Sequence, residues 1–246
     1  MNLVIPMAGK GKRLRPHTLT TPKPLIPIAG KPIVQRLVED IAAVTTDKIE
    51  EIGFVIGEFE DQVIEDLHRI AQSVGAKAHI FKQEEALGTA HAVHCARGVL
   101  KGNVTVAFSD TLFKANFMLN TQEDGIIWVK RVEDPSAYGV VNLDIEGVIT
   151  EFVEKPENPV SDLAIIGIYY FKDGEKLKSQ LDHIIDQNIT AGGEYQLTTA
   201  LENLKEQGTR FTTGTVDEWL DCGNKKVTVE SNSRYLGFLN KNIVAD

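Results

Sequence analysis

Glycine and cationic residues alternate in the stretch MAGKGKRLRPHTLTTPKPLIPIAGKP, which covers residues 7–32. Gly9 and Gly11 can adopt positive φ angles, which exposes backbone N–H groups and lets an anion approach closely. Two lysines and two arginines lie between or just after these glycines and add positive charge. Such a loop could bind phosphate, although a solvated loop with incidental charge would have the same composition.

The charge of the chain is distributed unevenly around this stretch. Residues 1–38 contain seven Lys or Arg and no Asp or Glu, whereas the other 208 residues contain 19 basic and 35 acidic side chains. The net charge of −9 argues against a general nucleic-acid binder. A local cationic loop on an acidic protein fits a small anion better than a polyanion.

Two common phosphate-binding motifs do not match the glycine-rich stretch. The G-x-x-x-x-G-K-[ST] spacing of a Walker loop is absent. The dinucleotide fingerprint fails because Leu14 stands where its third glycine would be. Four prolines between residues 16 and 27 also prevent the helix that would normally bind a pyrophosphate. An NAD(P)-binding oxidoreductase therefore does not fit the sequence.

Two aspartates are candidate ligands for a hard cation. Asp110 ends the apolar segment NVTVAFSD, at the carboxyl end of a predicted strand, where ligands collect in open α/β sheets. Asp221, in WLDCG, is far away in the sequence. For each of them the alternative is a helix-capping or turn aspartate, and their spacing alone does not pair them.

The elements that would position these residues alternate between strand and helix in the first half of the chain. Apolar runs predict strands over residues 2–7, 51–57, 76–83 and 103–110. Helical spacing predicts helices over residues 32–44 and 88–100, and another that ends near residue 73. Pro32 suits the first helical position. This alternation indicates a mixed, mostly parallel sheet flanked by helices on both faces.

After residue 120 the strand-like segments follow one another closely, with turn residues between them. They cover residues 125–132, 138–144, 147–155 and 163–172. Two helices over residues 172–187 and 194–207, a strand over 210–216 and a closing helix over about 225–240 follow them. We interpret residues 1–246 as a single α/β domain.

The composition is that of an ordinary globular protein, since 246 residues with 42% hydrophobic content can bury a substantial core. Cys95 and Cys222 are too few for a disulfide framework, which indicates a reduced, cytoplasmic setting. No apolar run reaches membrane-spanning length, and LVIPMA is too short and wrongly placed for a signal peptide. We expect neither a membrane nor a nucleic acid among the partners.

The segments MAGKGKRLRPHT and PKPLIPIAGKPI resemble the signature of the sugar-1-phosphate nucleotidyltransferases, also called nucleoside-diphosphate-sugar pyrophosphorylases. The resemblance continues in the family's order through QEEALGTAHAV, FSDTLF, SAYGVV, FVEKP, IIGIYYF, GEYQLTTAL and EWLDCGN. It implies their Rossmann-like nucleotide-diphospho-sugar transferase fold. It also implies a nucleotide-binding half over residues 1–120 and a sugar-phosphate-binding half over residues 121–246.

The family's reaction is an attack of a sugar-1-phosphate oxygen on the α-phosphorus of a nucleoside triphosphate, with pyrophosphate as the leaving group. This chemistry needs no protein nucleophile, but it needs two anions held in line and their charge neutralised. The resemblance implies Mg²⁺ as the cofactor, with Asp110 and Asp221 as its ligands. It further implies Arg13 at the β and γ phosphates and Lys23 at the reacting phosphate, because both side chains bind phosphate well.

The remaining candidate site residues also follow from the resemblance. The expected nucleotide-binding residues are Met7, Ala8, Gly9, Gly11, Arg13, Gln83 and Gly88. The expected sugar-phosphate-binding residues are Gly139, Glu154, Lys155, Ile165 and Tyr169, and Lys155 joins Arg13, Lys23 and Asp110 as the catalytic set. Without the family, Ile165 and Tyr169 would be assigned to the core, and Glu154 with Lys155 to a surface ion pair.

The expected reaction uses glucose-1-phosphate with dTTP or UTP. Pro24 replaces a glutamine that thymidylyltransferases often have at this position, which weakens the assignment of thymidine. A mannose-1-phosphate guanylyltransferase is an alternative, because GTAHAV is similar to that group as well. A catalytically silent nucleotide-sugar-binding regulatory protein is another. The sequence leaves the oligomeric state open, with a homo-oligomer among the alternatives.

Overall fold

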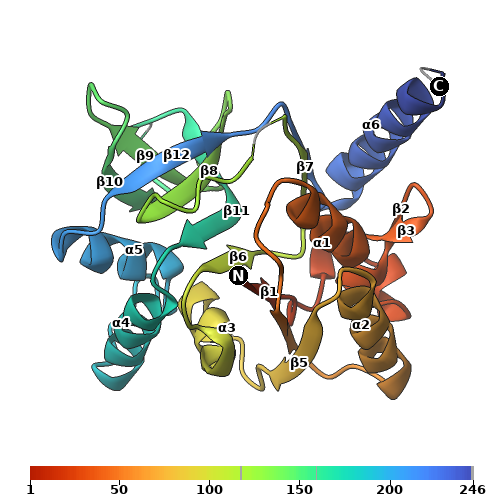
Figure 1. Cartoon of the computed structure of the whole chain (residues 1–246), viewed down its shortest axis with the longest axis horizontal. Coiled ribbons are helices and arrows are strands. Elements are labelled where there is room, and N and C mark those ends of the chain that lie inside the picture. Colours follow the sequence, from red (N-terminus) through yellow and green to blue (C-terminus); the bar gives the residue numbers. More distant parts are fainter. Residues whose placement is uncertain (117, 159, 245–246) are drawn as a thin grey trace.

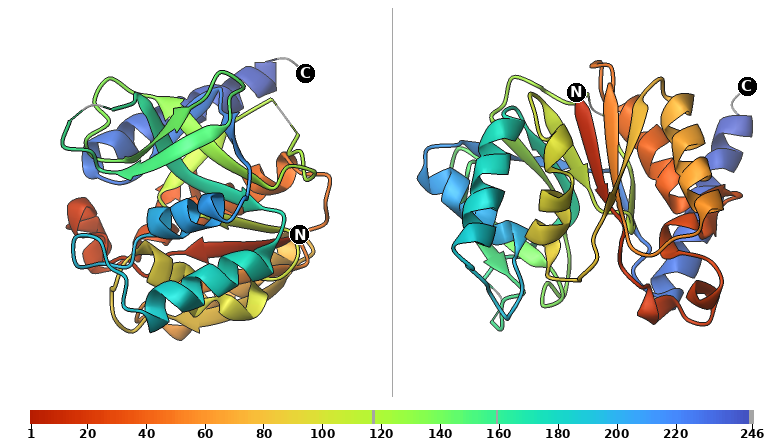
Figure 2. Two further views of the ribbon diagram at one scale, coloured as in Figure 1. Left: turned by 90° about the vertical axis from the view of Figure 1, so that its left-hand side faces the viewer. Right: turned by 90° about the horizontal axis from the view of Figure 1, so that it is seen from below.

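The computed structural model describes residues 1–244 except residues 117 and 159. A nine-stranded mixed sheet forms the centre of the molecule, and helices cover both of its faces (Figure 1 and Figure 2). The predicted α/β fold, a mixed sheet flanked by helices on both faces, is therefore confirmed. Within the described part of the chain, no helix is both long and apolar enough to cross a membrane.

The first half of the chain forms a parallel block of the sheet. Its strands are β1 (Asn2–Pro6), β4 (Glu51–Ile56), β5 (Lys77–Lys82) and β6 (Val104–Ala107). They lie in the order β6-β1-β4-β5, and each neighbouring pair is parallel. The helices between them along the chain are α1 (Ile33–Ala43), α2 (Asp61–Ser73) and α3 (Thr89–Cys95). The carboxyl ends of the four strands therefore meet at one edge of the sheet.

The second half of the chain extends this block with mostly antiparallel strands. They are β8 (Gly125–Arg131), β9 (Gly139–Leu143), β10 (Ile149–Glu154), β11 (Leu163–Phe171) and β12 (Phe211–Thr215), with helices α4 (Gly174–Asp186) and α5 (Leu197–Glu206). β11 pairs antiparallel with β6, β8 and β9, and it thereby joins the two halves into one sheet. Its register with β8 shifts around Gly167, which has a φ of +86°.

Alternate side chains of the central strands enter two hydrophobic cores on opposite faces of the sheet. On β1, Leu3 and Ile5 pack with residues of α1 and α2, whereas Val4 packs with residues of α3, α4 and α5. Figure 2 shows these two groups of helices on either side of the strands. Burial on both faces explains why β1 is a continuous apolar run, which is typical of parallel strands.

Two short antiparallel pairs and a final helix lie beside the main sheet. The pairs are β2 (Pro27–Ile28) with β3 (Lys31–Pro32) and β7 (Thr111–Lys114) with β13 (Glu218–Asp221). The helix α6 (Lys225–Val244) projects from the body of the molecule (Figure 1). Lys114 Nζ lies 2.7 Å from both Asp40 Oδ1 and the Tyr235 hydroxyl. These contacts tie β7 to α1 and α6.

Several predicted boundaries are wrong in ways that matter for the site. The strand predicted over residues 103–110 ends at Ala107, because the chain turns at residues 108–111. In this turn the backbone N–H of Thr111 donates to the carbonyl of Phe108 over 3.2 Å. The helix predicted over 88–100 ends at Cys95 and is followed by a short 3-10 turn. Pro32 occupies the N-cap of α1 and not its first turn.

Candidate active site

The residues expected to bind the nucleotide lie at the edge where the parallel strands end. The N–H of Met7 donates to the carbonyl of Val55, and the N–H of Gln83 donates to that of Ile56, each over 2.8 Å. A Cβ atom added to Gly57 would lie 3.1 Å from the carbonyl oxygen of Ala8. The ends of β1, β4 and β5 therefore present these residues together, as expected for an open α/β sheet.

The glycine-rich stretch folds into three short 3-10 turns: Lys12–Leu14, His17–Leu19 and Lys23–Leu25. Gly11 has a φ of +57°, and a Cβ added to it would lie 2.8 Å from Cγ2 of Thr18. The Thr18 hydroxyl also donates to the Gly11 carbonyl over 2.8 Å. Leu14 is buried and anchors the loop, while Arg13 beside it is exposed. The prolines thus replace a long helix with tight turns that leave Arg13 free to bind a ligand.

A lysine from this loop pairs with the predicted metal ligand Asp110. Lys23 Nζ lies 2.7 Å from Asp110 Oδ2. The Lys23 side chain is 11% exposed and that of Asp110 is 38% exposed, so the carboxylate remains open on one side. This ion pair links the cationic loop to the turn that follows β6.

The second predicted ligand, Asp221, lies next to Asp110 although the two are far apart in the sequence. β13 pairs with β7 so that Asp221 is opposite Thr111, and the N–H of Cys222 donates to the Asp110 carbonyl over 2.8 Å. The backbone N–H of Gly223 donates to Asp221 Oδ1 over 2.6 Å and orients the carboxylate. The fold therefore places Asp110 and Asp221 side by side.

The electrostatics of this cluster favour a cation. Burial raises the pKa of Asp221, and the charge of Asp110 raises it further. The N–H of Gly223 and the positive charges of Lys23 and Arg13 offset part of this rise, but the pKa of Asp221 stays above its ordinary value. Two neighbouring carboxylates with an open side fit Mg²⁺, which binds oxygen ligands and keeps several positions for water and phosphate. No group of three or more His, Cys, Asp or Glu within the described residues could hold a metal ion alone.

The residues expected to bind the sugar phosphate lie on the strands β9, β10 and β11 or, in the case of Lys155, directly after β10. A Cβ added to Gly139 would lie 3.2 Å from Glu154 Oε2 and 3.4 Å from Ile165 Cδ1, so these three residues line one small space. Lys155 follows β10 with a φ of +41°, which residues other than glycine rarely adopt. Its Nζ lies 3.6 Å from Glu154 Oε1, and its side chain is 59% exposed.

Tyr169 is close enough to residues of both groups for their charges to act on its hydroxyl. It is buried, and its pKa is raised by burial first and then by the charges of Glu154 and Asp110. Its ring packs edge-on against Phe108 with the ring centroids 6.1 Å apart. Tyr169 and Ile165 are thus core residues by burial, as the sequence alone suggested.

The Gln83 side chain contacts both Gly88 and His91. The sequence did not indicate the contact with His91. Gln83 Nε2 lies 3.1 Å from His91 Nδ1 and 3.4 Å from the Gly88 carbonyl. Gly88 has a φ of +116°, and a Cβ there would lie 2.4 Å from the carbonyl oxygen of Tyr195. The close approach of the Tyr195 backbone therefore requires a glycine at residue 88, whatever else Gly88 binds.

Two aromatic residues beside the cluster were also missed. The rings of Tyr138 and Trp219 pack edge-on with their centroids 5.1 Å apart, and Trp219 Nε1 donates to the Thr111 hydroxyl over 3.2 Å. Burial and the charge of Asp221 raise the pKa of Tyr138, and Arg13 lowers it. The N–H of Lys155 donates to the Tyr138 carbonyl over 3.1 Å. The sequence signal that could have identified them is their position in SAYGVV and EWLDCGN, close to the candidate residues Gly139 and Asp221.

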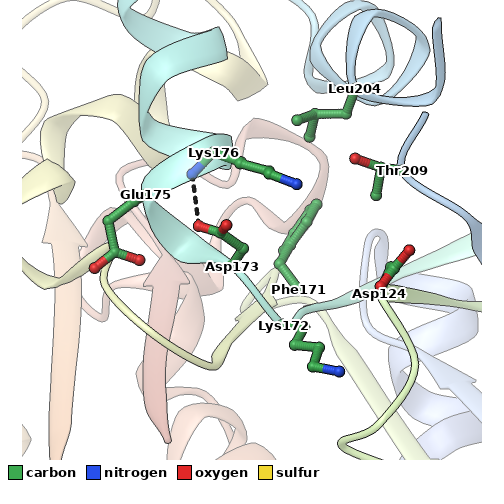
Figure 3. A pocket seen from close by; sticks show the side chains of 8 residues that line it. All are labelled: Asp124, Phe171, Lys172, Asp173, Glu175, Lys176, Leu204 and Thr209. Carbon is green, nitrogen blue, oxygen red and sulfur yellow. Dashed lines mark hydrogen bonds between the residues drawn. The ribbon is translucent and has the colours of Figure 1, made fainter. Parts of the chain in front are cut away.

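A cavity of about 540 Å³ lies at the start of α4, away from these residues (Figure 3). Phe171, Asp173 and Lys176 are part of its lining, and the Asp173 carboxylate caps α4 by accepting the N–H of Lys176. Because Phe171 pairs with Val104 at the beginning of β6, this cavity is at the opposite edge of the sheet. It contains none of the predicted site residues.

Comparison with known proteins finds relatives that match nearly the whole chain. The family described as "Nucleotidyl transferase" matches residues 3–237. The "Low-salt glycan biosynthesis nucleotidyltransferase Agl11" of Haloferax volcanii is 31% identical over 244 residues, which cover 96% of this chain and 66% of that protein. The "Bifunctional protein GlmU" of Methanococcus maripaludis is 32% identical over 239 residues, which cover 96% of this chain and 54% of that protein. The chain thus spans about half to two thirds of these curated relatives.

Solved structures share the fold. The "nucleoside-diphosphate-sugar pyrophosphorylase" of Vibrio cholerae superposes with a TM-score of 0.79 and covers 94% of this chain and 99% of its own. Its sequence is 22% identical, so the likeness concerns the fold alone.

Proposed function

The chain belongs to the nucleotidyl transferase family, and we propose that it transfers a nucleotidyl group from a nucleoside triphosphate to a sugar-1-phosphate and releases pyrophosphate. The observation that carries this proposal is the cluster of Lys23, Asp110 and Asp221. The N–H of Ser109 donates to the carbonyl of Pro6 at the end of β1, and the Thr111 hydroxyl donates to the carbonyl of Ile166 on β11, so Asp110 lies between a nucleotide-side strand and a sugar-side strand. Cations and a carboxylate pair at that point suit two phosphates that must react with each other.

The two halves of the chain would hold one substrate each. Residues 1–120 would bind the triphosphate, with the base and ribose at Met7, Ala8, Gly9, Gln83 and Gly88, and the phosphates at Gly11 and Arg13. Residues 121–246 would bind the sugar phosphate, with Gly139, Glu154, Ile165 and Tyr169 at the sugar and Lys155 at the phosphate. This division is supported by β11, in which Ile168 is opposite Ala107, the last residue of β6, whereas Ala164 is opposite Val140 of β9. β11 thereby carries the sugar-side residues past the edge where the parallel strands end.

The proposed reaction is a single displacement. An oxygen of the sugar phosphate forms a bond to the α-phosphorus, the bond from that phosphorus to the oxygen that bridges to the β-phosphorus breaks, and pyrophosphate leaves. Lys23 would exchange its contact with Asp110 for the reacting phosphate, and Arg13 would bind the departing phosphates with paired hydrogen bonds. Holding both substrates in line supplies most of the rate enhancement, so no side chain needs to act as a nucleophile.

Asp110 and Asp221 would hold a divalent ion, most simply Mg²⁺. When bound, this ion would neutralise phosphate charge and polarise the α-phosphorus. Two carboxylates are few ligands for it, which suits an ion that completes its shell with substrate phosphate and water.

The finer proposal is glucose-1-phosphate with dTTP or UTP. The alternative of mannose-1-phosphate and GTP keeps one observation in its favour, the GTAHAV segment that contains His91. The hydrogen-bonding partners of Gln83 in this structure, His91 and Gly88, would decide which base edge the site accepts. Base choice depends on a few such contacts.

A screen for released pyrophosphate tests the proposal. The purified protein is incubated with Mg²⁺, with each of dTTP, UTP, CTP, GTP and ATP, and with glucose-, mannose- and N-acetylglucosamine-1-phosphate in turn. We expect release that requires both substrates, and a nucleotide-sugar product identified by mass. Release without any sugar-1-phosphate would indicate a hydrolase, and a folded protein that releases nothing in any pair would refute the proposal.

A further inference from the structure

Two hydrogen bonds connect the helix α5 to β10, the strand that contains Glu154. The N–H of Phe152 donates to Glu202 Oε2 over 3.2 Å, and Lys205 Nζ donates to the Thr150 carbonyl over 2.6 Å. Both α5 residues lie in the second half of the helix, and both β10 residues precede Glu154 along the strand. α5 therefore runs antiparallel to β10, so the beginning of α5 lies toward Glu154.

The start of α5 is held by a residue from the nucleotide side. The Thr89 hydroxyl accepts the N–H of Leu197 over 2.9 Å and donates to Gln196 Oε1 over 3.1 Å. Leu197 is the first residue of α5, so its N–H has no partner within the helix. Thr89 lies 108 residues away and caps α5 in place of a local side chain. The position of the first turn of α5 is thereby fixed.

The next residue of that turn, Thr198, reaches the predicted sugar-binding carboxylate. Its hydroxyl donates to Glu154 Oε2 over 3.3 Å, and its side chain is almost fully buried. Its methyl carbon would lie 3.5 Å from a Cβ added to Gly139, so Thr198 also borders the same small space. The other carboxylate oxygen, Oε1, lies 3.6 Å from Lys155 Nζ. Each oxygen of Glu154 therefore has its own partner, which defines the orientation of the carboxylate.

We propose that Thr198 is a positioning residue for the sugar: its hydroxyl holds the Glu154 carboxylate so that this group accepts a hydrogen bond from a sugar hydroxyl. The proposal rests on the proposed function. A carboxylate can rotate about its last side-chain bond, which costs entropy when a ligand must immobilise it. A donor at one oxygen reduces that cost, and a buried threonine hydroxyl supplies it without adding charge.

The test compares Thr198→Val with Thr198→Ser. Valine keeps the shape of threonine and removes the donor, whereas serine keeps the donor and removes the methyl group. We expect Thr198→Val to raise the KM for the sugar-1-phosphate about tenfold, because a hydrogen bond to a charged group has about that effect. The KM for the triphosphate should stay within about twofold, and Thr198→Ser should behave like the parent protein. Thr199→Val, the same exchange one residue further along α5, is the matched control.

Sugar-1-phosphates that each lack one hydroxyl separate positioning from a structural role. With the parent protein, the analogue without the hydroxyl that Glu154 accepts should lose at least about tenfold in kcat/KM. With Thr198→Val this particular loss should shrink, while the losses for the other analogues stay the same. A merely structural effect would weaken all analogues alike, and thermal unfolding shows whether each variant folds. Thr198→Ala removes the hydroxyl as well and serves if the valine variant does not fold.

Two results would overturn the inference. One is Thr198→Val with a sugar KM equal to that of Thr199→Val. The other is an unchanged pattern across the deoxy analogues. Both results can be obtained only if the parent protein turns over its substrates, so neither of them contradicts the proposed function. If the parent protein shows no turnover with any sugar-1-phosphate, the proposed function fails first and the role of Thr198 fails with it.

Discussion

Replacing Asp110 with asparagine lowers sugar-1-phosphate-dependent pyrophosphate release at least about a thousandfold, and the protein stays folded. Asparagine has the same shape but no charge, so it removes one of the two carboxylates and leaves Lys23 without the negative charge that lies 2.7 Å from its Nζ. Asp221→Asn should have a similar effect, because the two carboxylates act on the same ion. Initial rates at saturating substrate and Mg²⁺ measure the loss, and thermal unfolding measures the fold.

The control for these variants is Asp186→Asn, which makes the same exchange at an exposed position at the end of α4. It should turn over like the parent protein. Binding of Mn²⁺, followed by electron paramagnetic resonance with the triphosphate present, gives a second readout that does not depend on turnover. If Asp110→Asn and Asp221→Asn both kept the parent rate, the assignment of these residues as metal ligands would be wrong.

Lys155→Met is the variant with the next largest expected effect. It removes the ammonium group beside Glu154 and keeps most of the length of the side chain. We expect kcat/KM for the sugar-1-phosphate to fall about a hundredfold, because hydrogen bonds from a charged donor to phosphate are strong. The KM for the triphosphate should change by less than about twofold. Steady-state kinetics with one substrate varied at a time separates the two effects.

Lys226→Met, on the exposed first turn of α6, is the control for the loss of one positive charge. It should leave both KM values unchanged. If Lys155→Met weakened only the binding of the triphosphate, Lys155 would belong to the nucleotide side and the proposed division of the chain would be incorrect.

The sheet and its helices could be predicted because hydrophobic periodicity is a local property. Strands such as β1 and β4 are continuous apolar runs, and the helices have apolar residues at helical spacing. The pair of β7 and β13 could not be predicted, since each strand has four residues and they lie more than 100 residues apart. This pair is what brings Asp221 beside Asp110, so the central contact of the site was accessible only through the family resemblance.

The supporting residues of the site were harder still to predict. Thr198 and Tyr138 have ordinary types in ordinary patterns, and their importance comes from partners elsewhere in the chain. The contact from Thr198 to Glu154 spans 44 residues and depends on how α5 is placed on β10. The glycine-rich loop was predicted better, because prolines exclude a long helix whatever the rest of the fold does. Its short turns and the position of Lys23 still required the structure.

The stereochemistry at the α-phosphorus tests the central claim most directly. That claim is a direct reaction between two bound substrates, with no protein nucleophile. A triphosphate with sulfur at one α-oxygen, prepared as a single stereoisomer, is used as substrate, and the configuration of the nucleotide-sugar product is determined by phosphorus NMR. A single in-line displacement predicts inversion at this phosphorus. Retention would require two successive displacements through a covalent intermediate, and it would contradict the account.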